Sequence, residues 1–155
     1  MLMALLKALH VLAVVVWVGG MAFAHFCLRP SLVLLEPPTR VKFMHAVLGR
    51  FFNGVLGAAG LIVISGFWMI GRAARQAVQS GGQFHLPLDW VVMTAVGVLM
   101  VALFGHIRFV LFKRLTAAVQ AADVPAAAAA IAAIRPWVAL NLGLGVGLIA
   151  LVLIY

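Results

Sequence analysis

Histidine is the residue type in this chain with the widest chemistry, and most of its histidines fall in or beside apolar segments. The five are His10, His25, His45, His85 and His106. Ionisable side chains are expensive in hydrocarbon and usually mark a functional site when they occur there. Because the chain has only three acidic residues, most of these imidazoles cannot be explained as partners of a carboxylate. A neutral imidazole is a good ligand for haem iron and copper, so the histidines predict a metal or haem site inside a membrane protein.

These histidines must be positioned by membrane-spanning helices, because the composition leaves room for little else. The chain has 155 residues, 66% of them hydrophobic, and its mean hydropathy is +1.23, whereas a soluble domain is closer to half apolar. Four apolar runs each approach the roughly 20 residues that cross a bilayer as a helix. They lie at about 3–28, 44–71, 88–112 and 132–154. We therefore expect an all-α, four-helix membrane bundle that forms a single domain over residues 1–155.

The net charge of +8 reports membrane topology. The basic residues flank the apolar runs and form no patch with aromatic platforms, which argues against nucleic-acid binding. Eight lie in or beside the first and third connections, namely Arg29, Arg40, Lys42, Arg50, Arg108, Lys113, Arg114 and Arg135. Three lie on the opposite side, namely Lys7, Arg72 and Arg75. Because cytoplasmic loops are enriched in Lys and Arg, this distribution predicts cytoplasmic first and third connections, with both termini outside the cytoplasm.

The third connection predicts a helical hairpin that protrudes into the cytoplasm. Asp123 is a good N-cap for the last helix, and the alanine-rich stretch 126–133 favours helix strongly. Further along the same helix, the small residues of Gly143-x-x-x-Gly147 predict a close contact with a neighbouring helix.

Helix order and the charge distribution sort the histidines into two groups at opposite membrane faces. His25, His45 and His106 fall near the cytoplasmic side, and His10 and His85 fall near the outer side. His10 and His25 are about 22 Å apart along the first helix, which is too far for one metal or one haem. We therefore expect two sites. His106 is the first choice as a ligand because it lies within an apolar run.

Two arginines near these histidines could meet an anionic group. Arg108 follows His106 by two positions and could pair with a haem propionate. Arg50 is the most costly side chain in the second apolar run. It needs a partner such as a propionate, a carbonyl at a helix C-terminus or a phospholipid phosphate.

Copper binding is a different chemistry that would use some of the same residues. Copper(I) favours soft ligands, which Met44-His45 and the Met21/His25 pair could supply. Against this, the methionines form no extended ladder of closely spaced residues, and Cys27 is the only cysteine. The absence of a Cys-x-x-Cys-His sequence excludes covalent attachment of a c-type haem.

Several of these segments resemble CopD-type membrane proteins. Residues 9–30, which contain His10 and the sequence WVGGM, are similar to the first helix of that family, and residues 50–69 are similar to the next. Residues 105–109 and 134–145 match a small bacterial branch of the family. The resemblance covers nearly the whole chain. It implies a multi-pass protein of the bacterial inner membrane, in a family associated with copper resistance and copper uptake.

The wider group that CopD proteins belong to includes b-type cytochromes and HemJ-type protoporphyrinogen oxidases. HemJ proteins carry a similar His-x6-Trp-x2-Gly pattern, which His10, Trp17 and Gly20 match, and a late third-helix histidine that corresponds to His106. Their lysine early in the third helix falls near Ala95, in a segment without lysine. This departure argues against protoporphyrinogen oxidase activity.

The leading hypothesis from sequence is a b-type haem protein that transfers electrons in the inner membrane. Its haem would take ligands from His106, His25 or His45, and a second site would use His10 and His85. A quinone, another redox protein or a second copy of the chain would be its partners, besides the lipid bilayer. Copper binding or uptake is the first alternative, and a HemJ-like porphyrinogen or quinol oxidoreductase is the second. Catalysis stays open because no acid–base or nucleophile constellation is visible.

Overall fold

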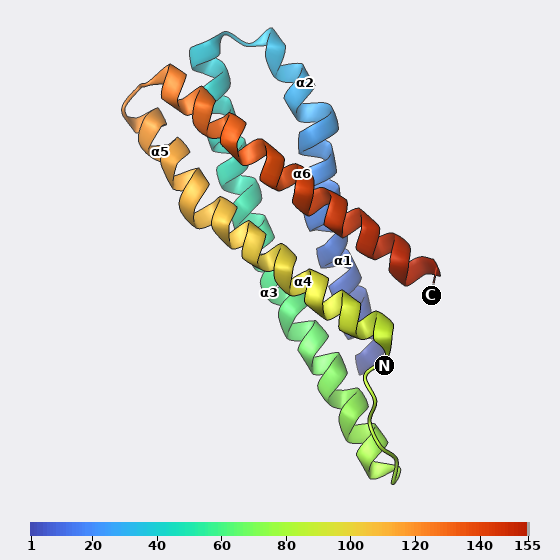
Figure 1. Cartoon of the computed structure of the whole chain (residues 1–155). Coiled ribbons are helices and arrows are strands. Elements are labelled where there is room, and N and C mark those ends of the chain that lie inside the picture. The colour runs from blue at the N-terminus through green and yellow to red at the C-terminus, as the bar shows by residue number, and fades with distance from the viewer. Residues whose placement is uncertain (155) are drawn as a thin grey trace.

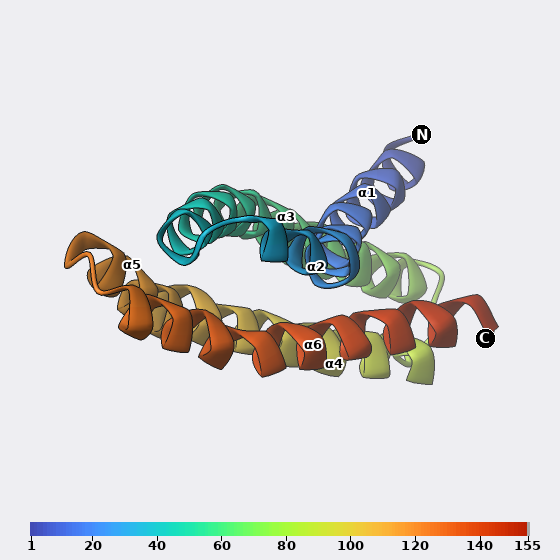
Figure 2. The same ribbon diagram turned by 90° about the horizontal axis from the view of Figure 1, so that it is seen from above.

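Residues 1–154, which the computed structural model describes, form long helices packed in two layers. One layer contains α1 (Leu2–Phe23) and α3 (Pro37–Gln79), and the other contains α4 (Leu88–His106), α5 (Phe112–Gln120) and α6 (Val124–Ile154). Figure 2 shows α1 and α3 on one side and α4 to α6 on the other. The predicted all-α bundle is therefore confirmed.

Short helical turns extend the longer helices. They are η1 (Ala24–Leu28), α2 (Arg29–Ser31) and η2 (Leu32–Leu34) after α1, and η3 (Ile107–Leu111) between α4 and α5. Both η1 and η3 are wide π-helical turns, which are frequent near functional sites. The first contains His25 and the second directly follows His106.

Four helical segments are long and apolar enough to cross a membrane, as predicted. They are Leu2–Leu34, Pro37–Gln79, Leu88–Gln120 and Val124–Ile154, and each contains one of the predicted apolar runs. In Figure 1 the first connection and the turn between α5 and α6 lie toward one end of the bundle, and both termini lie toward the other. The chain is therefore a multi-pass membrane protein whose two most basic connections share one end.

The predicted helical hairpin is formed by α5 and the first part of α6, which pack side by side (Figure 1). The carboxylate of Asp123 accepts a hydrogen bond from the backbone N–H of Ala126 at 2.9 Å. This bond confirms Asp123 as the N-cap. The preceding residue, Ala122, has a φ of 55°, the left-handed conformation that commonly ends a helix.

An aromatic cluster between the two layers forms the centre of the core. The ring of Phe52 on α3 lies 5.9 Å from Phe104 on α4 and 5.3 Å from Phe112 on α5, measured between centroids. Trp17 on α1 lies 5.7 Å from Phe104. All four side chains are buried, and edge-to-face contacts contribute about 0.5–1.5 kcal/mol each beyond the area they bury. The cluster therefore connects three of the four spans.

Gly145 lets α6 approach α1 and α4 closely. A Cβ atom at this position would lie 2.8 Å from Val18 and 3.1 Å from Met100. Gly143 and Gly147, by contrast, would place a Cβ with nothing within 4 Å. The predicted contact through Gly143-x-x-x-Gly147 is therefore not made within the part of the chain that the structure describes. The close approach uses the glycine between them.

Replacing Gly145 with leucine is expected to lower the free energy of unfolding in detergent by about 1–3 kcal/mol, because the new side chain must overlap Val18 and Met100. Gly147→Leu is the matched control, since it adds the same side chain to the same helix where space is open. The unfolding midpoints of the two variants and the parent protein measure the difference. Equal midpoints for the two variants would contradict this packing.

Candidate functional site

His10 is held from α3 by a serine hydroxyl. Its Nδ1 lies 2.9 Å from the Oγ atom of Ser65, which is 1% exposed. Ser65 donates its hydroxyl proton to the carbonyl of Leu61, 2.5 Å away, with the carbonyl of Ile62 also in reach at 3.2 Å. Because a hydroxyl has one proton, Ser65 must accept from the imidazole. Neutral His10 is therefore protonated at Nδ1, which leaves the lone pair of Nε2 available to a metal.

His10 lines a cavity of about 540 Å³ between α1, α3, α4 and α6. Three methionines line the same cavity, Met69 from α3 and Met93 and Met100 from α4. The other lining side chains are apolar or aromatic, except for Lys7 and Thr94. The cavity therefore offers one imidazole and three thioethers in apolar surroundings, with no carboxylate among its lining residues.

A second histidine is held in the same manner. The Nε2 of His45 lies 3.0 Å from the Oγ1 atom of Thr116 on α5, and Thr116 donates to the carbonyl of Phe112 at 3.0 Å. The threonine must therefore accept from His45, so neutral His45 is protonated at Nε2 and Nδ1 keeps its lone pair. The imidazole also stacks on the ring of Phe112, with centroids 5.2 Å apart and planes 8° from parallel. These contacts fix the plane of the ring.

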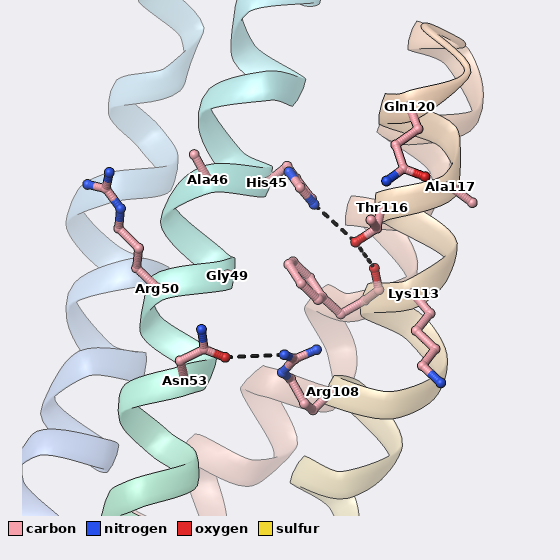
Figure 3. Close-up of a pocket in the computed structure, with 11 residues that line it drawn as sticks. His45, Ala46, Gly49, Arg50, Asn53, Arg108, Lys113, Thr116, Ala117 and Gln120 are labelled. Carbon is pink, nitrogen blue, oxygen red and sulfur yellow. Dashed lines mark hydrogen bonds between the residues drawn. The ribbon is translucent and has the colours of Figure 1, made fainter.

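His45 borders a second pocket, of about 590 Å³, between α3 and the η3–α5 segment. Arg50, Arg108 and Lys113 also line it. Figure 3 shows His45 and Arg108 projecting into the space between the helices, with Arg50 and Lys113 at its sides. Nη2 of Arg108 donates to the side-chain oxygen of Asn53 at 3.2 Å. The pocket is therefore strongly basic.

The other predicted ligands lie apart from these two sites. The ring of His106 lies 4.9 Å from that of Trp137 on α6, and the ring of His25 lies 4.9 Å from that of its neighbour Phe26. His85 is exposed on the connection between α3 and α4. Within residues 1–154, no three His, Cys, Asp or Glu side chains form a group that could hold a metal ion. Within these residues, His25, His45 and His106 thus do not form such a three-residue group.

Sequence reasoning missed the two hydroxyls and the convergence of the methionines. Ser65 and Thr116 lie 55 and 71 residues from the histidines they bind, so no local pattern links the partners. Met93 and Met100 are seven positions apart and so share one face of α4. The sequence holds no signal that Met69 comes to the same cavity from another helix.

Comparison with known protein families shows which family this chain belongs to. The bundle, with imidazoles and thioethers inside four spans, defines a multi-pass membrane protein with candidate metal ligands. The family model described as copper resistance protein D (CopD) matches residues 45–155. This match covers most of the chain, so the chain belongs to the CopD family. A search of curated proteins and a search of solved structures found no match. His10 lies before the matched segment, whereas the three cavity methionines lie within it.

The hydrogen bonds predict opposite tautomers for the two held histidines. In protein labelled with ¹⁵N-histidine and kept at a pH where both rings are neutral, His10 should carry its proton on Nδ1 and His45 on Nε2. The variants His10→Gln and His45→Gln assign the NMR signals. Ser65→Ala should remove the tautomer preference of His10 and leave that of His45 unchanged. Thr116→Val should remove the tautomer preference of His45 and leave that of His10 unchanged. An Nε2 proton on His10 in the parent protein would show that Ser65 does not orient it.

Proposed function

We propose that this protein binds copper(I) within the membrane, at the cavity lined by His10, Met69, Met93 and Met100. One observation carries the proposal: a histidine with a free ring nitrogen and three thioethers line the same apolar cavity. Thioether sulfur is a soft ligand that selects copper(I), and imidazole also suits copper. Membership of a family described as copper resistance protein D supports the same metal.

The charge of the cavity favours a soft monovalent ion over a hard divalent one. Its ligand candidates are all neutral, and among residues 1–154 the only charged side chain that lines it is Lys7. A divalent cation would enter apolar surroundings without a compensating carboxylate, which is costly. Magnesium and calcium also require oxygen ligands. Copper(I) needs neither a carboxylate nor oxygen ligands, because neutral thioethers bind it without losing a proton.

This proposal reverses the order of the two cofactors expected from sequence. Considered as sequence positions, Met93 and Met100 are scattered groups and give little reason to expect a copper site in the middle of the membrane. In the fold they share a cavity with His10 and Met69. A copper ion passing through or held in the bundle would therefore meet several soft ligands inside the apolar part of the protein.

Haem b is the second candidate, and the size of the same cavity favours it. A volume of about 540 Å³ falls within the roughly 300–1,000 Å³ typical of cofactor pockets. His10 and one of the methionines could hold the haem iron, as in some cytochromes, and Lys7 could pair with a propionate. With haem b bound, the protein would transfer electrons to or from a quinone or another redox partner. It would do so as a monomer or as a homo-oligomer. The haem b alternative also keeps three other candidate ligands, which are His106, His25 and His45.

A copper titration should separate the two proposals. The purified full chain in detergent is expected to take one copper(I) per chain in competition with a chromophoric chelator. His10→Gln and the single variants Met69→Leu, Met93→Leu and Met100→Leu should each weaken binding about tenfold or more, since even partners of ligands cost that much. Ser65→Ala should weaken it about tenfold.

Met44→Leu is the matched control, because Met44 is buried in the core but does not line the cavity. Leucine and methionine have similar volumes, so the fold should tolerate each exchange. Equal affinity in all variants would rule out this site. A Soret band with sharp α and β bands after reduction, in a sample that binds no copper, would favour haem b instead.

We also propose that the chain lies in the bacterial inner membrane with both termini on the periplasmic side. The first and third connections, which carry most of the basic residues, share one end of the bundle (Figure 1), and positive charge favours the cytoplasm. Alkaline phosphatase fused after residue 154 should be active, and the same enzyme fused after residue 122 should be inactive. The reverse pattern would mean that the orientation is inverted.

A further inference from the structure

We propose that the basic pocket between α3 and the η3–α5 segment binds the phosphate of an anionic phospholipid headgroup. The pocket shares no lining residue with the methionine cavity. The proposal is therefore independent of copper or haem binding there.

The pocket has an excess of positive charge that the protein does not balance. Arg50, Arg108 and Lys113 line it, together with His45. None of the three acidic residues of the chain is among its lining residues. Clustered cations at the edge of a membrane repel each other and are stabilised by an anion from outside the protein.

Arg108 is positioned to form a two-pronged contact with that anion. Its guanidinium lies 5.2 Å from the ring centroid of Phe112, and its Nη2 donates to Asn53 at 3.2 Å. Its Nε is buried and has no hydrogen-bond partner in residues 1–154. A buried donor without a partner is costly. Phosphate oxygens could accept from the Nη1 and Nη2 atoms at the end of the same planar guanidinium.

Other polar groups could complete the contact. Gly49 lines the α3 wall, where the Phe112 ring packs close to it, and Gln120 and Thr116 line the α5 wall. The side chains of Arg50 and Lys113 are exposed, so their long stems can bring the charges toward a bound phosphate. In Figure 3 the side chain of Arg50 extends from the far side of α3, away from Arg108, and Lys113 lies on the α5 side.

The depth of the pocket favours a lipid phosphate over a soluble one. On α3 the mainly apolar stretch 54–70 begins directly after Asn53. The mainly apolar stretch 90–107, over α4 and the first residue of η3, ends directly before Arg108. The pocket thus lies at the boundary of the apolar zone, where phospholipid headgroups are found. Phe109, which follows Arg108, is 53% exposed. It could lie against the acyl chain of the same lipid.

Native mass spectrometry of the delipidated full chain tests the proposal. Phosphatidylglycerol should bind at least about fivefold more tightly than phosphatidylcholine, because one cation near an anionic headgroup contributes about that factor. Arg50→Gln and Lys113→Gln should each weaken phosphatidylglycerol binding by about fivefold. Arg108→Lys keeps the charge but loses the planar fork, and it should weaken binding as well.

Arg114→Gln is the matched control, since Arg114 is exposed beside Lys113 but does not line the pocket. It should leave the affinity for phosphatidylglycerol unchanged. Equal binding of the two lipids, or equal losses in Lys113→Gln and Arg114→Gln, would overturn the proposal. Full displacement of phosphatidylglycerol by millimolar inorganic phosphate would show a site for soluble phosphate and would overturn the lipid assignment.

Discussion

Hydrocarbon offers no hydrogen-bond partner, so a polar side chain in the apolar zone of this bundle is stabilised by a partner inside the protein. Ser65 meets that requirement inside the apolar zone, and Thr116 does the same at its boundary. Each donates to a backbone carbonyl of its own helix and accepts from a histidine of another segment. Each bond ties two segments that are distant in sequence. Each also fixes which imidazole nitrogen keeps a lone pair. The need for hydrogen-bond partners therefore explains part of the helix packing. It also explains which imidazole nitrogen is left with a free lone pair.

The two layers meet at an aromatic core and leave two different spaces beside it. Where α6 approaches α1 and α4 through Gly145, the neighbouring cavity is apolar and lined by neutral soft ligands. Where α3 approaches the η3–α5 segment, near Arg108, the pocket is basic and lies at the edge of the apolar zone. Burying a charge in a bilayer is costly. This cost explains why the candidate ligands in the apolar cavity are neutral and why the cations lie at the boundary. The two proposed ligands, a copper(I) ion and an anionic headgroup, would thus occupy separate parts of one small bundle.

The sequence predicted the features that depend on local patterns. Hydropathy located the spans, and the Asp123 cap and the hairpin followed from residues within a few positions of one another. It could not predict how each helix is rotated, because a helix that is apolar all round, such as α6, does not indicate which face packs inward. The contact at Gly145 instead of Gly143 and Gly147, and the convergence of the methionines on His10, both depend on that rotation.

X-ray absorption spectroscopy of the copper(I)-loaded protein reports the atoms bonded to the metal. For a copper site built from His10 and the cavity methionines, we expect both sulfur and one imidazole nitrogen bonded to copper. The nitrogen should be lost in His10→Gln, and the sulfur should decrease in Met93→Leu. A shell of nitrogen and oxygen alone, or one that His10→Gln leaves unchanged, would contradict a copper site built from His10 and the cavity methionines.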